Sequence, residues 1–230
     1  MVKELSYPVV PVVLGILMYP YLRLNWTSCR LLLRRVDLSF RLVVYSVSLG
    51  VLMRIGSWAA IITLVSFDLA GNRLAEPVNG PVFSLVWPMM PEILLGFVVM
   101  CLLVPMTEEV VHRGFLLHSL LARGEAAAVV VSAAIFAASH PPQTYVLSFL
   151  AGLFLGMQTL SYRTLWAPFI THATFNAAMV IDQNFFYMVW SPAHPSATLT
   201  YAGVVALVIT FVSICACMFL ASEKAAGARR

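Results

Sequence analysis

The feature that most constrains this chain is the length of its apolar runs. Residues 93–106 read ILLGFVVMCLLVPM and residues 126–138 read AAAVVVSAAIFAA, and neither run contains a charged side chain. Only 10% of the 230 residues are charged, whereas a soluble domain carries about 25%. Several runs approach the ~20 residues that a helix needs to cross a bilayer. The sequence therefore predicts an all-α integral membrane protein, folded as one polytopic bundle of transmembrane helices.

The apolar runs predict seven membrane spans within a single domain of residues 1–230. The apolar stretch 82–91, VFSLVWPMMP, is interrupted by two prolines; if it spans separately, the count becomes eight. We expect N-terminal spans within 1–81, a core of four helices within 92–182, and an outer loop, a last span and a basic tail within 183–230. The predicted spans are 5–22, 42–66, 92–121, 126–140, 144–161, 164–182 and 198–220.

Charge bias predicts the orientation of these spans. If the loop after the first span is cytoplasmic, only Lys3 and Arg73 fall on the outer side. Because Lys and Arg concentrate in cytoplasmic loops, we expect the amino terminus outside and the carboxyl terminus inside, in a plasma membrane of the bacterial type. The net charge of +4 is thereby explained by topology, and no nucleic-acid partner is expected. The basic residues on the inner side are Arg23, Arg30, Arg34, Arg35, Arg41, Arg123, Arg163, Lys224, Arg229 and Arg230.

Ionisable residues inside predicted spans are costly in lipid and usually mark function. Arg54 lies in the middle of the second span and needs a buried partner, a water path or a displaced boundary. The segment EEVVHR, residues 108–113, lies within the third span. Glu109 and Arg113 are four residues apart and share a helix face, so they can pair. Glu108 points elsewhere and is left for chemistry, or for a position near water if the segment is only a structural staple.

The sequence positions of His140 and Glu108 predict that their side chains lie close together. Glu108 and His140 lie sixteen residues either side of Gly124, which occupies a short turn between two helical runs. An antiparallel hairpin about that turn puts both side chains roughly 24 Å along their helices, at ~1.5 Å per residue, so they can face each other. A histidine beside a carboxylate is suited to activating water, directly or through a metal. The alternative is a histidine that caps the end of its helix.

His172 and Asn176 form a third polar group. They are four residues apart and share a helix face. Asn176 cannot ionise, so it suits a site that stabilises developing negative charge without taking part in proton transfer. The alternative is a pair of side chains that hydrogen-bond between helices. His112, four residues after Glu108, is on the face of that carboxylate and is expected to tune or contact it.

These groups, in this order, resemble the motifs of the CPBP family of CAAX proteases and bacteriocin-processing enzymes, also called the Abi family. The family motifs are EExxxR, FxxxH and HxxxN, and the chain has EEVVHR at 108–113, FAASH at 136–140 and HATFN at 172–176. Each motif is weak alone, but the three on consecutive apolar segments form a specific pattern. The resemblance covers about residues 92–182.

The resemblance implies an intramembrane endopeptidase. In that case Glu108 is the general base that activates water, with assistance from His140. His172 and Asn176 then form the oxyanion hole for the tetrahedral intermediate. No GxSxG motif is present, and water is the expected nucleophile.

The resemblance also implies supporting roles and leaves the cofactor open. Glu109 and Arg113 hold the site in shape. His112 departs from the family pattern, which has an aromatic or aliphatic residue just before the motif arginine. The family has been described both as metalloproteases and as glutamate-dependent enzymes, so the expected cofactor is either none or a single zinc ion. The zinc ligands would be Glu108, His140 and His172.

The implied substrate is a lipidated, exported or membrane-anchored protein or peptide, cut near its carboxyl terminus or anchor. A site roughly 24 Å from the inner surface of a ~30 Å core is expected to open outward.

Two other functions are possible for this sequence. A non-catalytic immunity or scaffold protein of the same fold is disfavoured by the complete set of polar residues. An ion-coupled transporter is disfavoured by the absence of internal repeats in the sequence. The oligomeric state stays open.

Overall fold

The structure of the protein is a computed structural model. Apart from two short strands, its elements are helices, in agreement with the predicted all-α class. The predicted span 5–22 lies outside the described residues. These are residue 33 and the ranges 38–66, 83–85, 90–188, 201 and 203–216.

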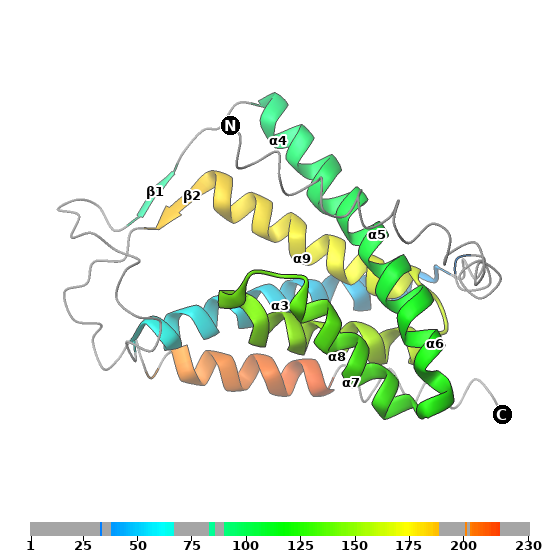
Figure 1. The fold of residues 1–230 in the computed structure, drawn as a ribbon. Coiled ribbons are helices and arrows are strands. Elements are labelled where there is room, and N and C mark those ends of the chain that lie inside the picture. Colours follow the sequence, from blue (N-terminus) through cyan, green and yellow to red (C-terminus); the bar gives the residue numbers. More distant parts are fainter. Residues whose placement is uncertain are drawn as a thin grey trace.

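One continuous helical rod carries the EEVVHR segment and contains two π-helical stretches. Figure 1 shows it as the green rod that descends from α4 to α6. π-Helical stretches are rare and frequently occur at functional sites. The rod consists of α4 (Met90–Gly96), η1 (Phe97–Leu103), α5 (Val104–Glu109), η2 (Val110–Leu117), α6 (His118–Leu120) and η3 (Leu121–Arg123).

The rod turns back at Gly124 into a hairpin of α7 (Glu125–Ala138) and α8 (Tyr145–Tyr162), with η4 (Pro142–Thr144) between them. Gly124 has a φ of 101°, which glycine adopts without steric cost. The two helices of the hairpin approach closely at Gly152, where an added Cβ would lie 2.9 Å from the Cα of Ala133. Helix α7 also contacts the η2 stretch of the rod.

The remaining pair is α3 (Phe40–Ser66) and α9 (Trp166–Phe185). These helices pack side by side, with Gly50 directly against the backbone of α9, so that an added Cβ would lie 2.5 Å from the carbonyl oxygen of Thr171. Strand β2 (Phe186–Met188) continues from α9 and pairs antiparallel with β1 (Phe83–Leu85). The apolar stretch 82–91 is therefore a strand, not a helix, over its residues 83–85.

Among the described residues, three helices are long and apolar enough to cross a membrane, namely Phe40–Ile61, Ile93–Arg123 and Pro142–Tyr162. They match the predicted spans 42–66, 92–121 and 144–161. Glu125–Ala138 and Gly203–Ala216 are shorter apolar helices within the predicted spans 126–140 and 198–220. Helix α9 covers the predicted span 164–182 but is less apolar because it carries His172, Asn176 and Asp182.

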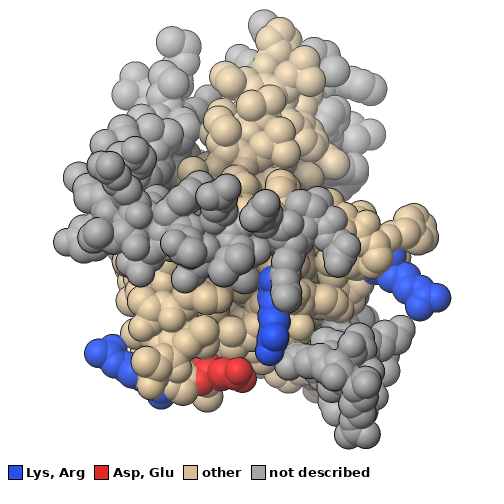
Figure 2. All heavy atoms as spheres, turned by 90° about the vertical axis from the view of Figure 1, so that its right-hand side faces the viewer, with Lys and Arg blue, Asp and Glu red and all other residues tan. Residues whose placement is uncertain are grey.

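Exposed charges gather at one end of the bundle. They lie where α3 begins, where the rod turns into α7, and where α8 ends. Figure 2 looks at this end, where the few blue and red side chains stand out against uncharged ones. The lateral faces expose hydrophobic side chains, such as Leu94, Val146 and Val205. Among the residues whose exposure the structure describes, the exposed charged ones are Arg41, Arg123, Glu125 and Arg163.

Candidate active site

A buried ion pair forms the base of the site. Arg113 Nη1 lies 3.3 Å from Glu109 Oε1, and the two side chains are 1% and 0% exposed. Arg113 Nη2 also donates to the carbonyl oxygen of Gly152 on α8, at 3.4 Å. The pairing expected from the four-residue spacing is thus present. It connects the rod to the α7–α8 hairpin in a region without solvent.

His172 joins this pair and turns toward the second carboxylate. Its Nδ1 lies 2.9 Å from Oε1 of Glu109. Because Glu109 is the counter-ion of Arg113 and accepts, His172 donates through Nδ1–H. The other ring nitrogen, Nε2, lies 3.6 Å from Oε2 of Glu108. Glu109 therefore fixes the ring of His172 with its Nε2 toward Glu108.

Glu108 is the partly exposed carboxylate of the site; the buried Oε2 of Glu109 also lacks a hydrogen-bond partner, but the side chain of Glu109 is 0% exposed. Oε2 of Glu108 is buried and has no hydrogen-bond partner, while the Glu108 side chain as a whole is 19% exposed. A buried oxygen without a partner is costly, and such a group often belongs to a functional site. Glu108 and His172 thus form a pair of side chains that can bind a small polar molecule, such as water, between the rod and α9.

Phe136 lies at the centre of the site, although the sequence reasoning did not single it out. Its ring centroid is 4.5 Å from that of His140, 5.2 Å from that of His112 and 5.9 Å from that of His172. The guanidinium carbon of Arg113 lies 4.4 Å from the same ring. The FAASH motif, which begins with this phenylalanine, was the sequence signal that could have identified it. Phe136 is 2% exposed and contacts all three polar segments.

His140 lies at the rim, separated from Glu108. It lies two residues after the end of α7, and its Nδ1 lies 2.8 Å from the carbonyl oxygen of Phe136, which also accepts from the N–H and the hydroxyl of Ser139. No contact between His140 and Glu108 is present in this described part of the chain. The sequence placed both at one depth but could not show that Phe136 lies against His140.

Asn176 and His112 are both buried, but in different surroundings. Asn176 Nδ2 donates to the carbonyl oxygen of Met100 at 2.7 Å. His112 is 5% exposed, stands edge-on against Phe136, and has a buried Nδ1 without a partner. Its expected contact with Glu108 is absent from this described site, because Glu108 faces His172 instead.

The side chains do not form a metal-binding arrangement. Within the described residues, no three His, Cys, Asp or Glu side chains are grouped as ligands for a metal ion. Nε2 of His172 faces Glu108, but His140 does not join them, because its Nδ1 contacts the carbonyl oxygen of Phe136 and its ring packs against that of Phe136. The set Glu108, His140 and His172 therefore does not fit a zinc ion as the residues stand, and we derive no step through one.

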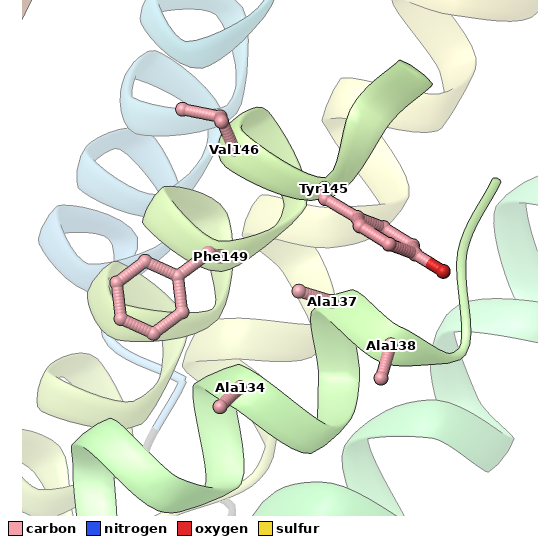
Figure 3. Close-up of a pocket in the computed structure, with 6 residues that line it drawn as sticks. All are labelled: Ala134, Ala137, Ala138, Tyr145, Val146 and Phe149. Atoms are coloured by element: carbon pink, nitrogen blue, oxygen red, sulfur yellow. The ribbon is translucent and has the colours of Figure 1, made fainter. Parts of the chain in front are cut away.

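An apolar groove lies on the outer face of the α7–α8 hairpin, apart from the buried polar site. Its volume is about 350 Å³. Figure 3 shows the small alanine side chains on one helix facing larger side chains on the other. Such a surface suits contact with lipid chains and offers no group for bond hydrolysis. The lining residues are Ala134, Ala137, Ala138, Tyr145, Val146 and Phe149.

Helices that are long and apolar enough to cross a membrane, together with a buried carboxylate–histidine–arginine cluster between the rod and α9, indicate an integral membrane protein. Residues 90–178 match the family described as "Type II CAAX prenyl endopeptidase Rce1-like". This segment contains all three motifs and is similar to this family of CAAX proteases. No curated protein and no solved structure matches the chain.

Proposed function

We propose that the protein is an intramembrane endopeptidase in which Glu108 activates a water molecule. The observation that carries this proposal is the free Oε2 of Glu108, 3.6 Å from Nε2 of a histidine whose other nitrogen is engaged by Glu109. A carboxylate with a free oxygen can accept a proton from water. The histidine beside it is held in one orientation, which removes the entropy of ordering it during the reaction.

In the proposed reaction, Glu108 takes a proton from water as the water oxygen attacks the scissile carbonyl carbon. The carbonyl π electrons move to oxygen and form the oxyanion. As the C–N bond breaks, Glu108 returns the proton to the leaving amine, so that no other reactant is required. Both ring nitrogens of His172 carry a hydrogen in this step. Nδ1–H donates to Glu109, and Nε2–H donates to the oxyanion. Asn176 donates its second amide hydrogen.

His140 takes an assisting role at the rim in this proposal. Its Nδ1 is bound to the carbonyl oxygen of Phe136, which leaves Nε2 to contact the substrate or the departing amine. The side chains that surround Phe136 would then act on one substrate carbonyl from the rod, α7 and α9. His112 is proposed to support this arrangement through its edge contact with Phe136.

We propose a lipidated, exported or membrane-anchored protein or peptide as the substrate, cut near its carboxyl terminus or membrane anchor. The family match supports a CAAX-type protease, and the lipid bilayer is the other partner. The exposed charges at one end of the bundle support a cytoplasmic position for that end under the positive-inside rule. The carboxyl terminus is then cytoplasmic, in the plasma membrane. His140, at the opposite end of α7, is proposed to face outward.

Cleavage of candidate substrates by matched glutamate variants tests this proposal. Membrane-anchored proteins with carboxyl-terminal tags would be co-expressed with the wild type, with Glu108→Gln and with Glu125→Gln, an exposed glutamate at the start of α7. We expect loss of the shorter product with Glu108→Gln and normal cleavage with Glu125→Gln. Equal cleavage by all three would refute the role of Glu108.

Treatment with a zinc chelator tests whether the hydrolysis proceeds without a metal ion. The wild type would be incubated with a zinc chelator before substrate is added. We expect unchanged cleavage. Loss of cleavage on chelation, restored by added zinc, would replace the proposed step with a zinc-dependent one. A wild type that binds a substrate but never cleaves it would instead favour the non-catalytic scaffold.

A further inference from the structure

One carbonyl oxygen of the rod is left without a helical donor because of a proline. In η1 the hydrogen bonds run to the fifth preceding residue, and the N–H of Val104 donates to the carbonyl oxygen of Val99. The next donor in this register would be the N–H of residue 105, directed at Met100. Residue 105 is proline and has no N–H. The carbonyl oxygen of Met100 therefore requires a donor from outside the rod.

Asn176 supplies that donor. Its Nδ2 lies 2.7 Å from the carbonyl oxygen of Met100, and its side chain is among the buried polar ones. The contact joins α9 to the rod across 76 residues of sequence. It occupies one of the two amide hydrogens of Asn176. No other hydrogen bond of this side chain is present in the described part of the chain, so the second hydrogen stays available.

The same proline also begins the helix that carries the two glutamates. Pro105 occupies the first turn of α5, and Glu108 and Glu109 end that helix. A proline suits the first turn of a helix because its fixed φ matches the helical backbone. Pro105 is buried and less than 2% exposed. A single residue thus sets both the start of the glutamate helix and the unpaired carbonyl that Asn176 binds.

We infer that Pro105 is a positioning residue for Asn176. By leaving the carbonyl oxygen of Met100 unpaired, it commits one amide hydrogen of Asn176 to the rod and thereby orients the other. The amide plane of Asn176 is fixed relative to Glu108, whose helix Pro105 begins. This inference rests on the proposed hydrolase, in which the second amide hydrogen stabilises the oxyanion.

A double-mutant cycle of Pro105→Ala and Asn176→Ala tests this inference in the full-length, membrane-reconstituted protein. Pro105→Ala restores an N–H that competes with Asn176 for the carbonyl oxygen of Met100. Two quantities are measured for the four proteins: kcat and KM for a cleaved substrate, and the thermal unfolding midpoint. Pro168→Ala is the matched control, because Pro168 is equally buried but lies in the first turn of α9, where no intrahelical acceptor is lost.

We expect kcat of Pro105→Ala to fall about 10- to 100-fold with KM unchanged, as for a misplaced catalytic group. Asn176→Ala is expected to lose about 10²–10³-fold in kcat, the usual loss for an oxyanion donor. The double variant Pro105→Ala/Asn176→Ala should have a kcat less than about twofold below that of Asn176→Ala alone. Asn176→Ala should also lower the unfolding midpoint less in the Pro105→Ala background than in the wild type. Pro168→Ala should retain wild-type kcat.

Two results would overturn the inference. One is a kcat of Pro105→Ala equal to that of the control. The other is an effect of Asn176→Ala on the unfolding midpoint that is the same in both backgrounds. If the wild type cleaves no substrate, the proposed function fails, and the unfolding midpoints still decide whether Pro105 and Asn176 are coupled.

Discussion

The charge of Glu109 is predicted to be one of the strongest contributions to the stability of this protein. Its side chain is 0% exposed and lies 3.3 Å from a guanidinium that is 1% exposed. Glu109→Gln keeps the size of the side chain and retains an oxygen that can accept from Nδ1 of His172. It removes only the negative charge. The guanidinium of Arg113 then stays buried without the carboxylate that contacts it.

Removing one partner of a buried ion pair costs about 3–5 kcal/mol, because the remaining charge is uncompensated. Both side chains are excluded from solvent, so solvent screening gives little relief. Within the described part of the chain, the guanidinium has one other hydrogen-bond partner, the carbonyl oxygen of Gly152 at 3.4 Å. For a protein of this size, each kcal/mol shifts the unfolding midpoint by about 2–4 °C. The expected decrease for Glu109→Gln is therefore about 6–20 °C.

Thermal unfolding of the purified protein in detergent measures this decrease. The double variant Glu109→Gln/Arg113→Met removes both charges and is expected to recover a large part of the lost stability, since a neutral pair needs no counter-ion. Glu125→Gln, at an exposed site, is the control and should unfold within about 0.5 kcal/mol of the wild type. The reasoning is refuted if Glu109→Gln matches this control, or if the double variant is no more stable than Glu109→Gln.

Three further predictions concern other parts of the bundle. Arg54→Leu should destabilise the protein by about 2–3 kcal/mol, measured by unfolding, because it removes the ion-pair partner of Asp182 at 2.6 Å and leaves the indole N–H of Trp58 on that carboxylate; a change within error of the wild type would contradict this. Gly152→Ala should cost about 1–3 kcal/mol because the new Cβ would lie 2.9 Å from Ala133; wild-type unfolding would show that α7 and α8 separate freely. Gln143→Cys, at an exposed position, should react with an impermeant thiol reagent added outside cells, and labelling only from the cytoplasmic side would reverse the proposed topology.

The membrane helices were predictable from the sequence because the bilayer imposes one simple rule on them. A long apolar run without charges has few other folds available, and the spans at 42–66, 92–121 and 144–161 were found on that basis. The span at 5–22 is still a prediction. The sequence did not predict the π-helical stretches, because α- and π-helices bury similar side chains and differ by one residue in hydrogen-bond register. It also did not predict strand β1, whose partner follows α9 about 100 residues later.

The site was predictable where it depended on spacing within one helix. The pairing of Glu109 with Arg113 follows from a four-residue separation. The neighbours of each group across helices were not predictable in the same way, because helix rotation and side-chain direction decide them. Glu108 was expected near His140 and lies near His172 instead. Arg54 was known to need a partner, and Asp182, 128 residues away, has no sequence signal that links it to that position.

Helix α3 lies outside the segment that matches the family, yet it fixes the helix that carries His172. Gln158 donates to Ser46 at 3.2 Å and to Thr171 at 3.0 Å, and the hydroxyl of Thr171 donates to the carbonyl oxygen of Ser46 at 3.1 Å. All three side chains are buried, so none of them can exchange its partner for water. Thr171 immediately precedes His172, and a rotation of α9 that broke these bonds would also turn His172 away from Glu109. The family segment therefore needs α3 to hold its own histidine in place.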